Sequence, residues 1–149
     1  MRIKKSFIQL SFICMLLAGS CIASAENAHV ITNNSVNVAS NQTDIKVMLK
    51  KMYLRQLNEW PDGSPVKVYL PEQGSAALSW FYEQILEMSE SEVAEYWLKL
   101  KQKTGETPHR QIASSSMLLK VVNQFEGAWG VVPTSESELP DKVKIILSQ

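Results

Sequence analysis

Short segments rich in Val and Ile alternate with amphipathic helical segments along most of this 149-residue chain. Residues 45–52, 78–86, 93–100 and 118–125 repeat apolar side chains at intervals of three and four, the pattern of a helix with one buried face. The short apolar segments between and around them, at 30–31, 66–70, 112–113, 128–132 and 143–147, fit strands or extended chain. Since alternating strands and helices pack in layers, the sequence predicts a layered α/β domain.

Capping and turn residues mark the limits of these segments. Residues 60–65 read Trp-Pro-Asp-Gly-Ser-Pro, a turn in which Pro fixes φ and Gly permits positive φ. Residues 89–92 read Ser-Glu-Ser-Glu, a capping box that opens the third helix. We expect Ser40 or Thr43 to cap the first helix and Ser114 to cap the last one.

The first 25 residues have the pattern of a secretory signal peptide. Three basic residues at positions 2, 4 and 5 precede an apolar stretch over 7–18, and Ala23-Ser24-Ala25 is a small-x-small cleavage pattern. The alternative is a lipoprotein signal with lipidation at Cys21. We therefore predict a signal peptide over residues 1–25, a mature domain over 26–149 and a periplasmic location, with no membrane span in the mature chain.

The mature composition excludes several classes of protein. Cleavage after Ala25 leaves 12 Lys and Arg against 15 Asp and Glu, a net charge of −3, with no basic run of the kind that nucleic-acid binding needs. Both Cys residues lie in the first 25 positions, so the mature chain has no disulfide and its core must supply the stability.

The polar residues give little support to catalysis or metal binding. His29 and His109 are far apart in sequence, and we expect both to be solvated surface groups rather than metal ligands. The run at 114–116 is three serines without a Gly-x-Ser-x-Gly pattern, so it predicts a helix start rather than a nucleophile. We therefore expect no enzyme activity, no metal and no cofactor.

The aromatic residues fall into packed and exposed candidates. Trp97 and Phe125 lie on apolar helix stripes and are expected to face inward, and Trp129 on a strand is expected to be packed. Trp80 lies off the main stripe of its helix and is the best candidate for an exposed aromatic side chain.

One segment has a physical route to an anionic ligand. Gly74 and Ser75 stand immediately before a helix, where the amides of Ser75, Ala76 and Ala77 are expected to be unpaired donors. The macrodipole and the Ser75 hydroxyl would favour an anion there. The alternative is an ordinary helix cap at Ser75.

Several of these segments together resemble a known family, the periplasmic phosphate-binding protein of the phosphate ABC transporter. The resemblance covers residues 30 to 133 and is to short, single-lobe relatives. It depends on Asp44-Ile45, Trp60-Pro61-Asp62-Gly63-Ser64-Pro65-Val66, Gly74-Ser75, Phe81-Tyr82-Glu83-Gln84-Ile85-Leu86, Tyr96-Trp97, Thr104-Gly105, Pro108 and Gly127-Ala128-Trp129-Gly130-Val131-Val132. It implies one lobe of a type 2 periplasmic-binding-protein fold, a mixed sheet flanked by helices.

The resemblance also implies where a ligand would bind. The family's phosphate loop usually reads Arg, then two or three residues, then Gly-Ser-Gly-Thr. Here Gly74 and Ser75 match, Ala76 and Ala77 replace the second Gly and the Thr, and Pro71 stands at the Arg position. The resemblance therefore implies a non-catalytic solute-binding domain with at most weak binding of phosphate or another small anion, working with a transporter or an envelope protein. The alternative is an interaction module of the cell envelope that has lost its ligand.

Overall fold

A five-stranded mixed sheet forms the centre of the molecule. The computed structural model describes residues 27–38, 41–134 and 138–149, so the predicted signal peptide lies outside the described residues. The strands, in the sheet order β3-β2-β4-β1-β5, are β3 Arg110–Ile112, β2 Lys67–Pro71, β4 Ala128–Pro133, β1 Ala28–Asn33 and β5 Val143–Ser148. Together with the helices on either side, this sheet confirms the predicted α/β class.

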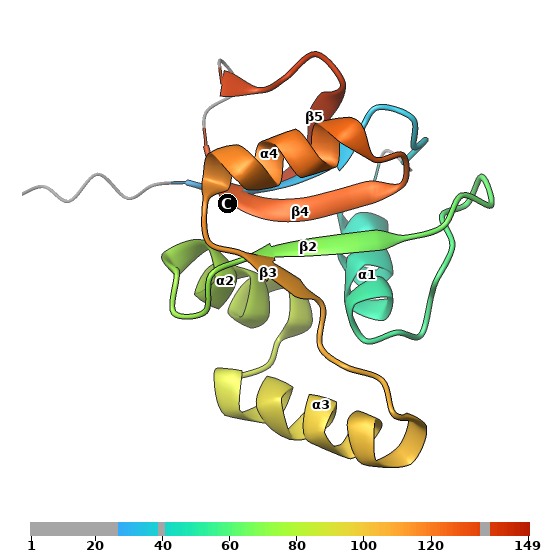
Figure 1. Cartoon of the computed structure of the whole chain (residues 1–149), viewed down its shortest axis with the longest axis vertical. Helices are drawn as coiled ribbons and strands as arrows, with labels where there is room; N and C mark the ends of the chain where they lie inside the picture. The colour runs from blue at the N-terminus through green and yellow to red at the C-terminus, as the bar shows by residue number, and fades with distance from the viewer. Residues whose placement is uncertain (1–26, 39–40, 135–137) are drawn as a thin grey trace, which may run out of the picture.

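Three neighbouring strands run in the same direction. β2 is parallel to β3, with Tyr69 opposite Arg110, and parallel to β4, with Tyr69 opposite Gly130. β1 is antiparallel to β4 and to β5. The carboxyl ends of β2, β3 and β4 therefore lie at one edge of the sheet, the left edge in Figure 1.

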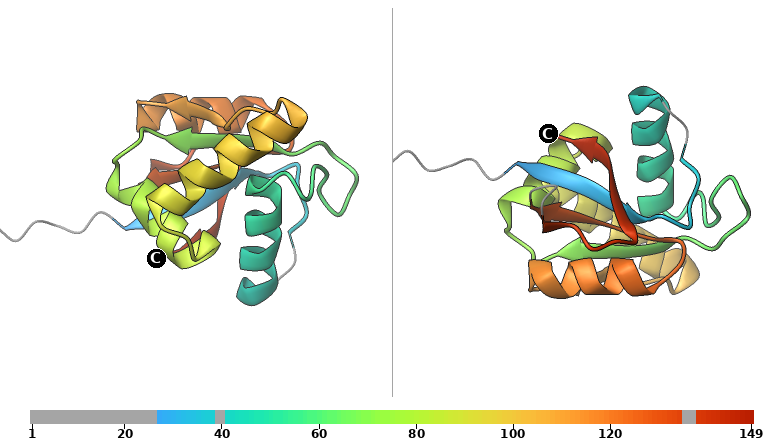
Figure 2. Two further views of the ribbon diagram at one scale, coloured as in Figure 1. Left: turned by 90° about the horizontal axis from the view of Figure 1, so that it is seen from below. Right: turned by 90° about the horizontal axis from the view of Figure 1, so that it is seen from above.

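The helices are distributed unevenly around the sheet. They are α1 Gln42–Tyr53, α2 Ala76–Phe81, the π-helix η1 Tyr82–Leu86, α3 Glu90–Thr104 and α4 Ser115–Gln124. In the two views of Figure 2, α4 covers one face of the sheet, while α1 and α2 cover the other. α3 lies apart from both layers, beyond the sheet edge formed by β3 (Figure 1).

The predicted buried faces are largely confirmed. Trp129 and Phe81 are fully buried and Trp97 is 4% exposed, all in the larger core cluster, while Leu118 of α4 is buried in a second cluster on the other face of the sheet. Phe125 is the exception, because α4 ends at Gln124 and the backbone of Phe125 is extended. Its side chain therefore leaves the helix stripe and is 38% exposed.

The helix ends show which predicted caps are confirmed by the structure. Ser114 caps α4, and the capping box between Ser89 and Glu92 is formed at α3, both as predicted. The cap of α1 is Asn41, whose Oδ1 accepts the Thr43 amide at 3.0 Å, so the choice of Thr43 was wrong, and Ser40 lies outside the described residues. The helix predicted over 78–86 widens into η1 and ends at Glu87 with φ 55°.

Candidate functional site

The carboxyl ends of the parallel strands place two helix starts at one edge of the sheet. β2 is followed by a loop that ends at Ser75, the N-cap of α2, and β3 is followed by Ser114, the N-cap of α4. Pro71 lies opposite Ile112, so β2 and β3 end side by side and the two loops begin next to each other. In open α/β sheets this edge is where ligands usually bind. The repeated strand–loop–Ser–helix order could have located this pairing in the sequence.

The hydrogen bonds of Ser75 are already used within the chain. Its amide donates to the Glu72 carbonyl at 3.2 Å, and its Oγ accepts the Leu78 amide at 3.3 Å. The prediction that the Ser75 amide is an unpaired donor is therefore wrong, and the alternative, an ordinary cap, is what the structure has. The tight turn that causes this is closed by Gly74, whose φ is +81°.

The remaining predicted site residues offer little to an anion. Ala76 is exposed, whereas Ala77 is 3% exposed and packs in the core, so the two side chains lie on different sides of α2. α2 has only six α-helical residues before η1, which limits the aligned dipoles behind its N-terminus. Pro71 is buried where the family has its Arg, and the exposed Glu72 adds a negative charge beside the loop.

A more enclosed space lies between α3 and the β2–β3 end of the sheet. We call it the α3 groove; it encloses about 320 Å³. α1, η1, α3 and the segment before β3 all contribute to its walls. The lining residues used below are Tyr82, Glu90, Leu98, Lys101, His109 and Gln111.

Buried aromatic residues with polar atoms form the inner wall of the α3 groove. Trp97 Nε1 donates to the Tyr53 hydroxyl at 3.2 Å, and the Tyr53 hydroxyl donates to the Tyr82 hydroxyl at 3.3 Å. Burial, with the hydrogen bond to Tyr82, raises the pKa of Tyr53 well above its usual value. Burial also raises the pKa of Tyr82, and the charge of Glu90 adds to the rise.

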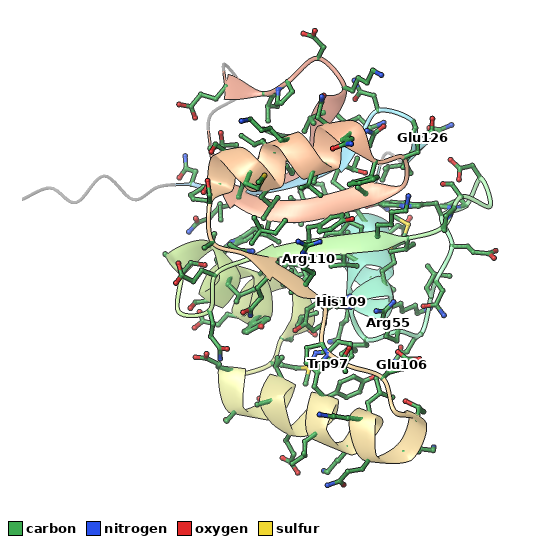
Figure 3. All side chains as sticks on the ribbon, in the orientation of Figure 1. Arg55, Trp97, Glu106, His109, Arg110 and Glu126 are labelled. Carbon is green, nitrogen blue, oxygen red and sulfur yellow. The ribbon has the colours of Figure 1, made fainter. Side chains whose placement is uncertain are left out.

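His109 belongs to this wall and was wrongly predicted to be a surface residue. It is 7% exposed, and its ring lies 5.1 Å from that of Trp97, edge to face. Its Nε2 donates to the Tyr53 carbonyl at 2.7 Å. Burial, reinforced by the positive charge of Arg55, lowers the pKa of His109 to about 4, so the ring is neutral at pH 7. Figure 3 shows Trp97 and His109 approaching each other from α3 and from the chain that enters β3.

A shallow basic hollow lies at the amino ends of the same strands. Arg55, Lys67 and Arg110 contribute to its lining. Arg55 is paired with Glu106 at 3.4 Å, and the Lys67 ammonium lies 5.4 Å from the centre of the Phe125 ring. Arg110 is exposed on β3. Sequence analysis missed this hollow because its cations are 12 or more positions apart in the chain.

The other candidates are placed as follows. His29 is half-buried on β1, with its Nδ1 2.9 Å from the Ser148 Oγ, far along the sheet from His109. Trp80 is half-buried and packs against the core, although it remains the most exposed of the four Trp. Within residues 27–38, 41–134 and 138–149, no three His, Cys, Asp or Glu side chains gather as a metal site would require, and no helix is long and apolar enough to span a membrane.

Comparison with known proteins supports the fold. No protein-family model and no curated sequence matches the chain. A protein from Clostridium perfringens assigned as a phosphate ABC transporter substrate-binding protein, solved with bound phosphate, superimposes with a TM-score of 0.58 and 20% identity over 80% of this chain and 44% of its own. An ABC-type phosphate transport receptor from Vibrio cholerae gives 0.55 and 17% over 80% of this chain and 45% of its own. The chain thus spans less than half of these proteins and has the fold of a single periplasmic-binding-protein lobe, as predicted.

Proposed function

We propose that this chain is an exported, non-catalytic solute-binding-like domain that interacts only weakly with phosphate or another small anion. Export would remove residues 1–25, or lipidate Cys21 in the alternative, and leave the domain in the periplasm. Support comes from the shared lobe fold and from the position of Gly74 and Ser75 at the carboxyl edge of β2. The solved relatives are substrate-binding proteins, which favours a binding role over catalysis.

The state of Ser75 is the observation that carries the weak affinity. Its amide already donates to the Glu72 carbonyl, so an anion that used this donor would have to replace that bond. The loop contains no Arg that could form a bidentate, charge-assisted pair with the anion. A carboxylate such as Glu72, at about 6 Å from a bound anion, would oppose it by roughly 2–3 kcal/mol at an effective dielectric near 20. We therefore expect a phosphate Kd on the order of millimolar or weaker.

Calorimetric titration with phosphate tests this proposal. Glu72→Gln should strengthen phosphate binding several-fold, because it removes the like charge nearest to the loop. Glu95→Gln, an exposed carboxylate on the outer side of α3, is the matched control and should change nothing. Micromolar binding by the unchanged protein, or equal effects of the two substitutions, would contradict the proposal. An affinity loss caused by Arg110→Gln would move the anion site to the basic hollow.

The alternative, an envelope interaction module, is favoured by one surface. Met117 is 53% exposed and Phe125 is 38% exposed, so the outer side and the end of α4 present apolar groups to solvent. A photo-crosslinking residue at position 117 should capture one discrete envelope protein if this surface docks a partner. Absence of a discrete product in intact cells would count against this alternative.

A further inference from the structure

We propose that the α3 groove binds a short, extended peptide with free ends, held between α3 and the edge strand β3. This goes beyond anion binding at Ser75 and concerns a different part of the molecule. Three independent features of the groove support it: the open sheet edge, the unused polar groups on its inner wall, and the opposite charges at its two ends.

The open edge of the sheet is the first feature. β3 is paired with β2 on one side only and ends the sheet order on the other. Its residues Arg110 and Gln111 are exposed, although α3 lies beyond this edge (Figure 1). Edge strands present backbone N–H and C=O groups that an extended peptide can pair with. α3 is held near this edge by the buried side chains of Trp97 and Val93 and by a 2.6 Å hydrogen bond from the Tyr96 hydroxyl to the Leu54 carbonyl.

Unused hydrogen-bonding capacity on the inner wall is the second feature. The Tyr82 hydroxyl accepts from Tyr53, which leaves its own proton without an acceptor among the described residues. Because His109 Nε2–H donates to a carbonyl, the neutral ring has an acceptor at Nδ1, which also lacks a partner in the described part of the chain. Both side chains are only 7% exposed and line the α3 groove. One donor and one acceptor match the carbonyl and amide of a peptide unit.

Charges at the two ends of the groove are the third feature. Glu90 and Lys101 lie on the same side of α3, eleven positions apart, which corresponds to about 16 Å at 1.5 Å per residue. An extended peptide of about five residues spans the same length at roughly 3.3 Å per residue. Its amino group would lie at Glu90, whose Oε1 is oriented by the Gln73 amide at 2.7 Å, and its carboxylate at Lys101. Leu98, 57% exposed between them, would contact a central apolar side chain.

The direction of the peptide follows from this placement. β3 runs toward the edge where α3 begins, so a peptide with its amino group at Glu90 runs antiparallel to β3. Antiparallel pairing gives the more stable ladder per residue. The geometry thus favours a zwitterionic peptide over a single small anion, which has no positive end for Glu90.

The test uses the pentapeptide Ala-Ala-Leu-Ala-Ala, added to the full protein and followed by amide NMR shifts. We expect saturable shifts centred on residues 90–101 and 109–112. The acetylated and amidated form of the same peptide should bind at least tenfold more weakly. Lys101→Gln and Glu90→Gln should each lower the affinity for the free peptide several-fold. The outward-facing controls Lys103→Gln and Glu95→Gln should leave this affinity unchanged.

A further variant distinguishes the contribution of the inner wall to peptide binding from that of the charged ends of the groove. Tyr82→Phe removes only the hydroxyl. It should lower the affinity for the free peptide and for the acetylated and amidated peptide by the same factor. The proposal is overturned if the free peptide produces no shifts at millimolar concentration. It is equally overturned if blocking the ends leaves affinity unchanged, or if the shifts lie outside the groove. Normal amide spectra of each variant show that a loss of binding is not a loss of folding.

Discussion

We call residues 72–77, between the carboxyl end of β2 and the start of α2, the Ser75 edge. The Ser75 edge and the α3 groove differ in how their polar groups are used. At this edge the Ser75 amide donates to the Glu72 carbonyl and the Ser75 Oγ accepts the Leu78 amide, so the Ser75 amide is already used within the chain. In the α3 groove, the Tyr82 hydroxyl proton and the His109 Nδ1 have no hydrogen-bond partner among the described residues. A motif match therefore gives only the position of a loop in the fold, whereas the engaged donors and acceptors show which polar groups are available to a ligand.

The largest effect that can test this comparison is the removal of Trp97, which holds α3 near the sheet. Trp97→Ala should lower the free energy of unfolding by roughly 3–5 kcal/mol, the range for emptying a buried aromatic site. Chemical denaturation measures it. Leu98→Ala, beside it but 57% exposed, is the control and should change stability by less than about 0.5 kcal/mol. Equal effects of the two would show that α3 does not depend on its buried face.

Acidification should act on the α3 groove rather than on the Ser75 edge. The folded-state pKa of His109 is about 4, below the value of 6.5 for an unperturbed His. The unfolded state therefore binds a proton first, and stability is lost as the pH falls from about 6.5 toward 4, by roughly 3 kcal/mol in all. Denaturation midpoints across this range measure the loss. His109→Gln should flatten the profile, and a slope unchanged by this substitution would contradict the assignment.

Removal of the helix caps of α2 and α3 should have a smaller effect on stability, and this effect should differ between the two regions. Ser89→Ala and Ser75→Ala should each cost about 1 kcal/mol. Loss of the Ser89 cap should raise hydrogen exchange most within α3, because only Val93 and Trp97 of this helix are buried. Loss of the Ser75 cap should lower global stability, since α2 buries Leu78 and Phe81 in the core. Exchange that rises equally in both regions after either change would show that α3 unfolds together with the body.

The elements could be predicted from the sequence because their signals are local. The spacing of Leu78, Phe81 and Ile85 defines a buried helix face, and the capping box at Ser89 needs only four residues. The strand order could not be predicted, because β4 lies between β1 and β2 through pairings about 60 to 100 positions apart.

The site residues were harder to predict because their surroundings also depend on contacts between segments that are far apart in the sequence. His109 is buried because the chain after α3 returns to Tyr53, 56 positions earlier, a contact that its neighbours in sequence do not indicate. Phe125 follows the helical spacing, but its backbone has already left the helix. Gly74 and Ser75 were located correctly before a helix, yet whether the Ser75 amide is engaged depends on how the loop closes onto Glu72.

Phosphate titration of the purified protein, followed residue by residue through amide NMR shifts, tests the central claim most directly. The claim is that the Ser75 edge offers no strong anion site because the Ser75 amide is engaged within the chain, the loop has no Arg, and Glu72 adds a like charge. We predict that the amides of Ser75, Ala76 and Ala77 shift little and do not saturate below millimolar phosphate. Micromolar saturation centred on these three amides would contradict it.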